Sequence, residues 1–358
     1  MPKILFIANH RPNRSPSQRF RFEQYLSFLK QEGWDYDFSF LISEKADSIF
    51  YKKGHLFQKM GIFFNSFFIR WNNVLNASKY DVIFIQREAF ITGTTFFEKR
   101  FSKSNAKIIY DFDDSIWLSN VSDANKNWNW LKNPNKTKEI IGVSDLVFAG
   151  NQYLADYAKQ VNNNIIIIPT TIDTEEYKKI PSSNDKICIG WSGSITTIQH
   201  FEYALSFLRA LKVKYGNQIE IKVIGDKNYV NNEIDVKGID WKKEDEIKEL
   251  SSFDIGIMPL PNDEWSSGKC GLKGLQYMAL EIPTIMSAVG VNTEIIQDGI
   301  NGYLATTEKD WIEKIAKLIE SKELRNKVGL AGRKTVLTKY SVKSTQNKYI
   351  THFNQLIK

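Results

Sequence analysis

Short apolar segments rich in β-branched and aromatic residues recur along the chain, and each is followed by a segment long enough for a helix. A continuous apolar run is typical of a parallel strand covered on both faces. Separation by helix-length sequence favours strand–helix–strand units. The strands that this pattern predicts are residues 3–8, 81–86, 107–110, 145–149, 165–168, 187–191, 219–224, 254–258 and 283–287. The alternation therefore predicts an α/β protein built on doubly wound parallel sheets.

The pattern is interrupted once, between residues 169 and 186, where proline, serine and asparagine are typical of a linker. The chain has 358 residues, and single hydrophobic cores stop growing at roughly 250–300 residues. We therefore expect two Rossmann-like domains that face each other across a cleft. The predicted division is a first domain at 1–170, a linker at 171–186, a second domain at 187–340, and a C-terminal helix at 341–358 that packs back on the first domain. The predicted helices are 17–30, 199–214, 244–251, 271–280, 310–320 and 323–340.

The apolar run at 3–8 resembles the start of a signal peptide, but Asn9, His10 and Arg11 end it too soon. The sequence also has no stretch of about 18 apolar residues that could span a bilayer. Two cysteines are too few for a disulfide framework and fit a reducing compartment. These features predict a cytoplasmic protein.

Several common catalytic motifs are absent from the sequence. It has no Walker motif and no G-x-G-x-x-G after a predicted strand, which argues against a P-loop kinase and a dinucleotide oxidoreductase. It has no G-x-S-x-G motif, and its four histidines lie too far apart for a zinc site. The net charge of +7 permits an anionic partner, but the basic residues match no nucleic-acid-binding module.

One segment has the composition of a phosphate site. Gly268, Gly271 and Gly274 lie between a predicted strand and a predicted helix, where backbone can approach a ligand closely. Lys269 and Lys273 add two positive charges to the same turn. Glycines before a helix often only make a turn, but the two lysines favour an anion site that would suit a diphosphate.

The order of motifs over the second half resembles retaining glycosyltransferases of the GT-B fold, in glycosyltransferase family 4. The motifs are Val223-Ile-Gly-Asp226, Val236-Lys-Gly-Ile239, Phe253-Asp-Ile-Gly-Ile-Met-Pro259, Tyr277-Met-Ala-Leu-Glu-Ile-Pro-Thr-Ile285, Val289-Gly-Val-Asn-Thr-Glu-Ile-Ile296, Asp298-Gly-Ile-Asn-Gly302, Leu324-Arg325 and Ala331-Gly-Arg333. The resemblance implies a nucleotide diphosphate-sugar donor bound mainly by the second domain and an acceptor bound by the first. It implies no metal and no cofactor beyond the donor substrate.

The donor segment departs from that family, which usually has two glutamates eight residues apart. Gly268 and Gln276 occupy those positions here, and an amide accepts a ribose hydroxyl more weakly than a carboxylate does. The arginine and lysine usual at the start of the second domain are absent from residues 190–197, so we assign their catalytic role to Lys269 and Lys273. The expected donor-binding residues are Gly193, Ser194, Gly268, Gly271, Leu272, Gln276 and Glu294.

The first domain departs further, because its first strand is followed by arginines where the family has glycines. Arg14, Arg19 and Arg21 are suited to an acceptor phosphate or to the leaving group of the donor. The alternative is an exposed basic first turn of a helix.

Acidic residues follow the predicted strand at 107–110. Asp113 aligns with a histidine of the family and is expected to orient the acceptor hydroxyl, or to act as a general base if its pKa suits. Asp114 is an acceptor-side candidate beside it, and Arg87 could compensate their charge. A metal-binding D-x-D motif of the GT-A type is the alternative, which the two-domain pattern argues against.

Residues 48–78 carry many aromatic residues, four basic residues and no Asp or Glu. Such a segment can lie in an anionic membrane interface. The alternative is a helix pair that packs on the core of its own domain, with its lysines in solvent.

These features predict a metal-independent, retaining glycosyltransferase, which acts on a saccharide or a lipid-linked saccharide in cell-surface polysaccharide or glycan biosynthesis. It would be cytoplasmic, at the inner face of the membrane if residues 48–78 contact lipid. Two alternatives remain open: a GT-B sugar-nucleotide epimerase, and a catalytically degenerate protein that binds nucleotide-sugar or serves as a scaffold.

Overall fold

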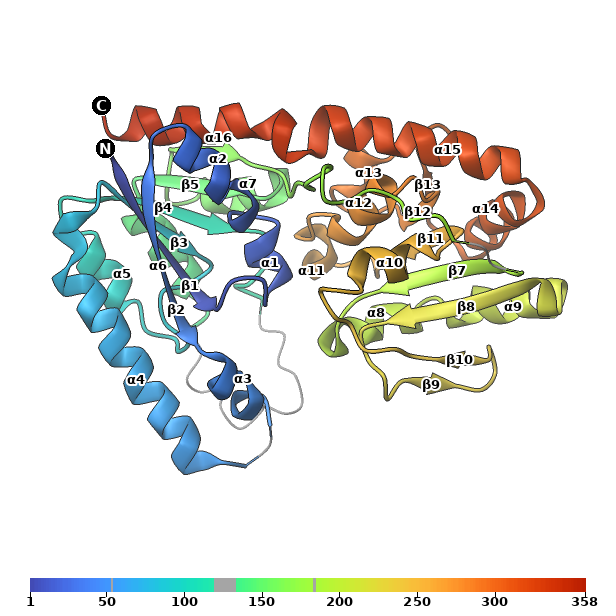
Figure 1. Ribbon diagram of the computed structural model, residues 1–358, viewed down its shortest axis with the longest axis horizontal. Helices are drawn as coiled ribbons and strands as arrows, with labels where there is room; N and C mark the ends of the chain where they lie inside the picture. Colours follow the sequence, from blue (N-terminus) through green and yellow to red (C-terminus); the bar gives the residue numbers. More distant parts are fainter. Residues whose placement is uncertain (53, 119–132, 183–184) are drawn as a thin grey trace. The chain divides into compact units, whose positions relative to one another are not determined.

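The computed structural model describes residues 1–52, 54–118, 133–182 and 185–358, and these residues form two compact units (Figure 1). Unit 1 comprises Met1–Pro169 and Gln346–Lys358, and unit 2 comprises Thr170–Thr345. Lys53, of the basic segment, and Ser183 and Asn184, of the predicted linker, lie outside the described residues.

Unit 1 is built on a six-stranded parallel sheet with the strand order β2-β1-β3-β4-β5-β6. Its inner strands are continuous apolar runs, which fits burial on both faces. The strands are β1 (Lys3–His10), β2 (Asp35–Ile42), β3 (Val82–Gln86), β4 (Lys107–Phe112), β5 (Leu146–Ala149) and β6 (Ile165–Ile167). The sequence predicts all of them except β2.

Helices cover both faces of this sheet. On one face, Tyr349 of the C-terminal helix stacks on Tyr25 at 4.4 Å between ring centroids, and Phe353 stacks on Phe84 at 6.2 Å. The helices are α1 (Pro16–Arg19), α2 (Leu26–Gln31), α3 (Glu44–Phe50), α4 (Leu56–Leu75), α5 (Phe96–Phe101), α6 (Lys136–Val143), α7 (Gln152–Ala158) and α16 (Val342–Leu356), whose last residues belong to unit 1.

The helix predicted at 17–30 is broken into α1, a 3₁₀ turn at Glu23–Tyr25 and α2. Arg21 and Phe22 are consecutive residues and are both buried, although neighbours on a regular helix point about 100° apart. The backbone of Phe22 leaves the helical region, with φ −136° and ψ −31°. The break thus lets consecutive side chains enter the core.

Unit 2 has a five-stranded parallel sheet with the order β13-β12-β11-β7-β8 and a separate antiparallel pair, β9 with β10. The sequence predicts β7, β8, β11 and β12, whereas β13, β9 and β10 have only two or three residues each. The strands are β7 (Ile187–Ser192), β8 (Ile219–Ile224), β9 (Val230–Asn231), β10 (Val236–Lys237), β11 (Ile255–Met258), β12 (Thr284–Ser287) and β13 (Tyr303–Ala305).

The helices of unit 2 pack on a hydrophobic core in which Phe207 stacks on Trp311 at 4.7 Å. Residues of the predicted linker 171–186 belong to this unit, and Tyr177 among them is buried. The helices are α8 (Ile198–Glu202), α9 (Leu205–Tyr215), α10 (Glu246–Ser251), α11 (Glu264–Ser267), α12 (Leu272–Ala279), α13 (Asn292–Ile295), α14 (Glu308–Glu320) and α15 (Lys322–Thr335), which continues as a π-helical turn at Val336–Tyr340.

A buried ion pair joins the segment between α1 and α2 to the end of β4. Arg21 and Asp111 are fully buried side chains, with Nη2 2.5 Å from Oδ1, and Arg21 also donates to the backbone oxygen of Ile168. The structure therefore corrects the prediction that Arg21 holds a phosphate: its guanidinium neutralises a carboxylate inside unit 1.

Replacing Arg21 with methionine should destabilise the protein strongly, because Asp111 would remain buried without its counter-charge. We expect Arg21→Met to lower the free energy of unfolding by about 3–5 kcal/mol, measured by urea denaturation. Lys159→Met, which removes an exposed pair with Asp156, is the control and should cost less than about 1 kcal/mol. Equal stability of Arg21→Met and the wild type would contradict the structural role.

Candidate active site

The predicted site residues lie at the carboxyl ends of strands in both units. In unit 1 the strand order reverses between β1 and β3, and in unit 2 it reverses between β7 and β11. Ligands of open parallel sheets bind at the carboxyl edge beside such a reversal. The candidate ligand-binding edge of each sheet is therefore the one beside this reversal.

Helix α12 begins at the proposed phosphate turn of unit 2. Gly271, its N-cap, has φ +69°, and a Cβ there would lie 2.4 Å from Cδ1 of Ile295. Leu272 is the first helical residue, and the first N–H groups of a helix have no partner within it. A left-handed turn therefore exposes the positive end of α12 to a ligand.

Gly274 has a different role from the predicted one. A Cβ at this position would lie 1.6 Å from Cε of Met286 on β12. The glycine thus lets α12 pack closely against the sheet, and we correct the expectation that it allows backbone to approach a ligand.

Two tryptophans position the lysines of this turn. The ammonium of Lys273 lies 5.0 Å from the ring centroid of Trp191 at the end of β7, and that of Lys269 lies 4.8 Å from the ring of Trp265 in α11. Gly268 is the C-cap of α11 and leads into this segment. Cation–π contacts of this kind hold each charge beside the start of α12 while its side chain stays half-buried.

His200 on α8 is a residue of this region that the sequence analysis misses. Its side chain is 5% exposed. Burial, and then the charges of Lys273 and Lys269, lower the pKa of His200 to about 4, against the opposing effect of Asp263. His200 is therefore neutral at neutral pH and lies within electrostatic reach of both lysines. A lone histidine after the loop at 190–197 gives no sequence signal for this placement.

Gly193 and Ser194 form the loop after β7. A Cβ on Gly193 would lie 2.1 Å from Cη2 of Trp191, the same ring that contacts Lys273. Ser194 is exposed, and its backbone N–H donates to Oγ1 of Thr197 at 2.9 Å. The ring of Trp191 therefore lies against both this loop and Lys273 of α12.

Gln276, which was expected to contact the ribose of the donor, is buried in unit 2. It is 5% exposed, and its Nε2 donates to the hydroxyl of Tyr177 at 3.0 Å and to Oε1 of Glu246 at 3.2 Å. Tyr177 itself donates to Oε2 of Glu246 at 2.6 Å. The amide nitrogen of Gln276 therefore ties residues 173–180 to α10.

Glu294 is exposed on α13. The same short helix carries Ile295, which lies against Gly271 at the start of α12. The structure therefore brings the helix of Glu294 to the phosphate turn, as the predicted donor contact requires.

In unit 1, Asp113 is held by groups from two other segments, α1 and the residue after β3. Its Oδ1 accepts from Oγ of Ser17 at 2.6 Å and from Nε of Arg87 at 2.9 Å. Nε2 of Gln86 donates to the same Ser17 hydroxyl at 2.7 Å. Ser17 and Gln86 are partners that the sequence analysis misses, because they lie far from Asp113 along the chain.

The pKa of Asp113 is lowered. Burial alone would raise it, but the charges of Arg87 and Arg21 and the hydrogen bonds from Ser17 and Arg87 outweigh burial. Arg87, which has a left-handed backbone with φ 62°, also lies 3.7 Å from Asp114. The expected compensation by Arg87 is thus present, and Asp113 is a weak proton acceptor.

The other two arginines predicted to bind phosphate, Arg14 and Arg19, differ in burial. Arg14 is partly exposed, but its Nε lies 2.5 Å from Oδ2 of Asp47, which Arg11 also contacts at 2.7 Å. Arg19 is buried, with its guanidinium 5.0 Å from the ring of Phe20. Of the three arginines predicted to bind phosphate, Arg14 therefore keeps the most accessible charge.

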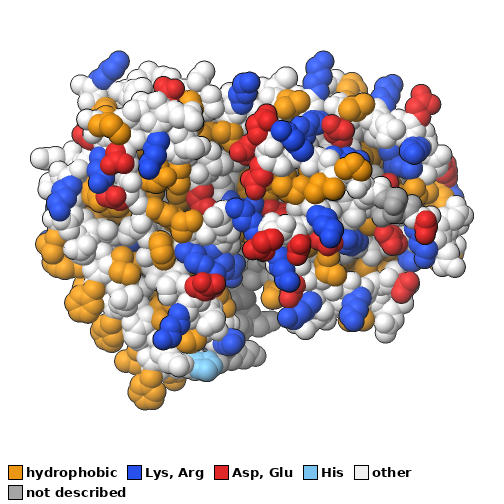
Figure 2. Space-filling model, viewed as in Figure 1, with side chains coloured by type: hydrophobic (Ala, Val, Ile, Leu, Met, Phe, Trp, Pro, Cys, Tyr) orange, Lys and Arg blue, Asp and Glu red, His pale blue; other side chains and the backbone are white. Residues whose placement is uncertain are grey.

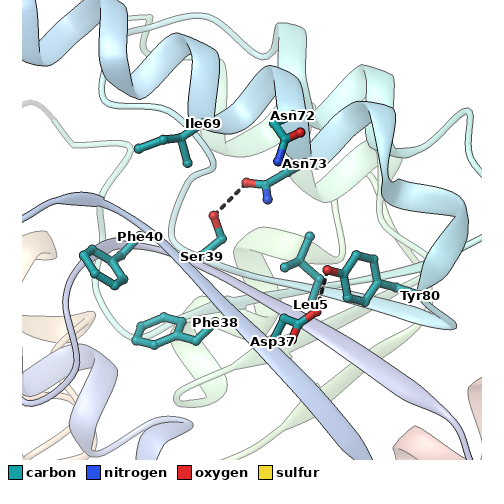
Figure 3. A pocket seen from close by; sticks show the side chains of 9 residues that line it. All are labelled: Leu5, Asp37, Phe38, Ser39, Phe40, Ile69, Asn72, Asn73 and Tyr80. Carbon is teal, nitrogen blue, oxygen red and sulfur yellow. Dashed lines mark hydrogen bonds between the residues drawn. The ribbon is translucent and has the colours of Figure 1, made fainter.

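Each unit has a cavity among its described residues. One, of about 270 Å³, lies at the carboxyl ends of β11, β12 and β13 and includes Leu260, Ser287 and Trp311 in its lining. The other, of about 460 Å³, lies between β2 and α4 (Figure 3). Its polar side chains bond to one another, since Ser39 donates to Asn73 and Tyr80 to Asp37, each at 2.7 Å. The first cavity lies on the edge that carries the candidate site of unit 2.

Comparison with known proteins gives the same fold. Residues 173–335 match the family of glycosyl transferases group 1. Sucrose-phosphate synthase from Thermosynechococcus elongatus superposes with a TM-score of 0.74 at 13% identity, covering 99% of both chains. A glycosyltransferase from Rickettsia africae superposes with a TM-score of 0.68 at 14% identity, covering 100% of this chain and 99% of its own.

HepE of Anabaena, in complex with UDP and glucose, superposes with a TM-score of 0.66 at 14% identity, covering 99% of this chain and 100% of its own. No curated protein matches in sequence. The predicted fold class is confirmed, and the family match covers the segment that carries α12. The chain has the GT-B fold, with two Rossmann-like α/β units, and its residues 173–335 are similar to the glycosyl transferases group 1 family.

Proposed function

We propose that the protein is a glycosyltransferase that moves a sugar from a nucleotide diphosphate-sugar to a saccharide or lipid-linked saccharide. The observation that carries this proposal is the start of α12, where Lys269, Lys273 and the first N–H groups of the helix meet. A diphosphate needs such compensation most when the sugar departs and negative charge develops on the leaving group. The family match over 173–335 and the GT-B fold support the same reaction class.

The donor would bind to unit 2 through the loop after β7 and the start of α12. Gly193, Ser194, Gly271 and Leu272 offer backbone groups there, and Glu294 is an exposed carboxylate suited to sugar hydroxyls. The crystallised HepE was in complex with UDP and glucose, and we extend that ligand class, a nucleoside diphosphate and a hexose, to this chain. Gly268 supplies no side chain, so sugar contacts must come from other residues.

Catalysis would be independent of metal and of any cofactor, and it would retain the anomeric configuration. Metal independence is supported by the two lysines in unit 2 and by Arg21 and Arg87, which neutralise the aspartates of unit 1. Retention is carried over from the resemblance to family 4. Activity that a chelator abolishes and Mn²⁺ restores would contradict the metal-free proposal.

Asp113 would accept a hydrogen bond from the acceptor hydroxyl rather than take its proton. A lowered pKa keeps the group ionised but makes it a weak base. Asp114 and Arg14 would contact the acceptor beside it. We place the reaction in cell-surface polysaccharide or glycan biosynthesis in the cytoplasm, at the inner face of the membrane, which the exposed face of α4 supports.

Two other functions remain distinguishable by experiment. A GT-B sugar-nucleotide epimerase would convert the donor without any acceptor. A scaffold or nucleotide-sugar-binding protein would bind the nucleotide but neither transfer nor hydrolyse the sugar, and the replacement of both family glutamates by Gly268 and Gln276 favours this alternative most.

The donor proposal predicts that a nucleoside diphosphate stabilises the protein against heat, since a ligand of the native state raises apparent stability by mass action. When the unfolding temperature is measured with a series of nucleoside diphosphates and their sugars, ligands with one particular base should raise it most. Lys273→Ala or Lys269→Ala should weaken the binding of these ligands by about tenfold or more, the value of one lost charge-assisted hydrogen bond.

Lys309→Ala is the matched control, because Lys309 is exposed on α14 and pairs only at the surface with Glu313. It should leave binding unchanged. Unaltered affinity in both Lys269→Ala and Lys273→Ala would remove the diphosphate site from α12.

The acceptor proposal predicts that Asp113→Asn lowers kcat by about a hundredfold or more, with donor affinity unchanged because the donor binds to unit 2. Since the pKa of Asp113 lies below its ordinary value, this group should produce no loss of rate between pH 7 and pH 5; its loss should begin only as pH falls further towards that pKa. Steady-state rates of wild type, Asp113→Asn and the surface control Asp156→Asn check both statements. Transfer by Asp113→Asn within about twofold of wild type would refute the role.

A further inference from the structure

Helix α4 of unit 1 carries apolar side chains on two adjacent faces. Its inner face packs on the helix and loop that follow β3: Phe63 lies 5.3 Å from Phe90, and Phe67 lies 5.3 Å from Phe97, between ring centroids. Trp71 stacks on Phe96 at 6.1 Å. This face accounts for only part of the aromatic content of residues 48–78.

The outer face of α4 is exposed. Phe57 is 90% exposed and Phe68 is 66% exposed, and Met60, Phe64 and Leu75 are each more than half exposed. Intervals of three, four, four and seven residues place these five side chains on one stripe of the helix. Figure 2 shows hydrophobic side chains gathered along the edge of the molecule where Figure 1 draws α4. A contiguous apolar surface of this kind on a monomer usually marks a contact.

The charged residues of the segment that carries this stripe have one sign. Residues 48–78 contain no Asp or Glu. Among the described residues of this segment, Lys52 is exposed and Lys59 is half-buried. Arg70 does not add to this surface, because it is fully buried and donates to the backbone oxygens of Ala8 and Ala89. The stripe is therefore apolar and aromatic, with lysines at its N-terminal end.

We propose that the outer stripe of α4 docks unit 1 on a lipid bilayer that carries anionic headgroups. Phenylalanine, methionine and leucine side chains enter the boundary between headgroups and acyl chains, while lysines contact the phosphates beside it. A second copy of the chain would bring lysines of like sign together, whereas an anionic surface offers them complementary charge. This proposal goes beyond sugar transfer and does not depend on it.

The geometry fits a helix that lies on the membrane. The stripe occupies one side of α4, and on the opposite side Ser66 and Arg70 are fully buried within unit 1. No helix among the described residues is long and apolar enough to cross a bilayer. The helix of 20 residues would be about 30 Å long, so the whole stripe can touch the surface when α4 lies parallel to it.

Vesicle co-flotation of the full chain tests this surface without requiring turnover. The wild type should float with vesicles of phosphatidylcholine and phosphatidylglycerol, and much less with phosphatidylcholine alone. The double variant Phe57→Ser/Phe68→Ser should reduce the bound fraction by about tenfold or more. Val213→Ser, at an equally exposed position on α9 of unit 2, is the control and should float like the wild type.

The charge contribution has its own pair of variants. Lys52→Glu/Lys59→Glu should weaken flotation with anionic vesicles, whereas Lys178→Glu/Lys309→Glu, which changes net charge equally on unit 2, should not. Circular dichroism and thermal unfolding establish that each variant is folded. Lys52, Lys178 and Lys309 are exposed and Lys59 is half-buried, so both measurements should stay unchanged.

Failure of the wild type to float with anionic vesicles would overturn the proposal. So would flotation that the Phe57→Ser/Phe68→Ser variant retains, since another surface would then carry it. A wild-type dimer in sedimentation velocity that this variant dissociates, without vesicle binding, would assign the stripe to a second copy instead. None of these outcomes bears on nucleotide binding by unit 2, so failure here leaves the transfer proposal standing.

Discussion

The left-handed turn at Gly271 is the constraint on which the candidate site of unit 2 depends. A side chain at this position would collide with Ile295 and would also have to adopt a backbone conformation that L residues rarely take. Because the turn is made there, α12 starts with its N–H groups at the carboxyl edge of the sheet. Lys269 and Lys273 flank that start and are held against Trp265 and Trp191. The chemistry proposed for the protein follows from this one turn and its two charges.

In unit 1, the corresponding edge of the sheet carries negative charge that arginines neutralise. Three aspartates lie within four positions at the end of β4 and just after it. Each is matched by an arginine from another segment: Asp111 by Arg21, and Asp113 and Asp114 by Arg87. The first pair is sealed in the core, and the second is partly accessible. This difference separates a carboxylate that holds the fold together from one that can meet an acceptor.

Much of the fold could be predicted from the sequence, because its buried strands are short β-branched runs with helix-length spacing. The missed strand β2 reads DYDFSFLI and lies at the sheet edge, half exposed, so polar residues interrupt the expected run. The predicted helix at 17–30 breaks because Arg21 and Phe22 both enter the core. That requirement is set by Asp111, 90 positions further along the chain, and local sequence does not reveal it.

The sequence could predict the part of the candidate site that rests on the spacing of glycines and lysines before α12. It could not predict the surroundings of residues whose hydrogen-bond or packing partners lie far along the chain. Gln276 donates hydrogen bonds to Tyr177 and Glu246, which are 99 and 30 positions away, and His200 lies near the two lysines only because of tertiary packing.

The most direct test of the proposed diphosphate site is a crystal structure of the chain with a nucleoside diphosphate. The account predicts that the phosphates lie at the start of α12, within hydrogen-bond distance of the Lys269 and Lys273 ammonium groups. Phosphates bound elsewhere, with both lysines remaining on their tryptophans and without contact to the ligand, would contradict it.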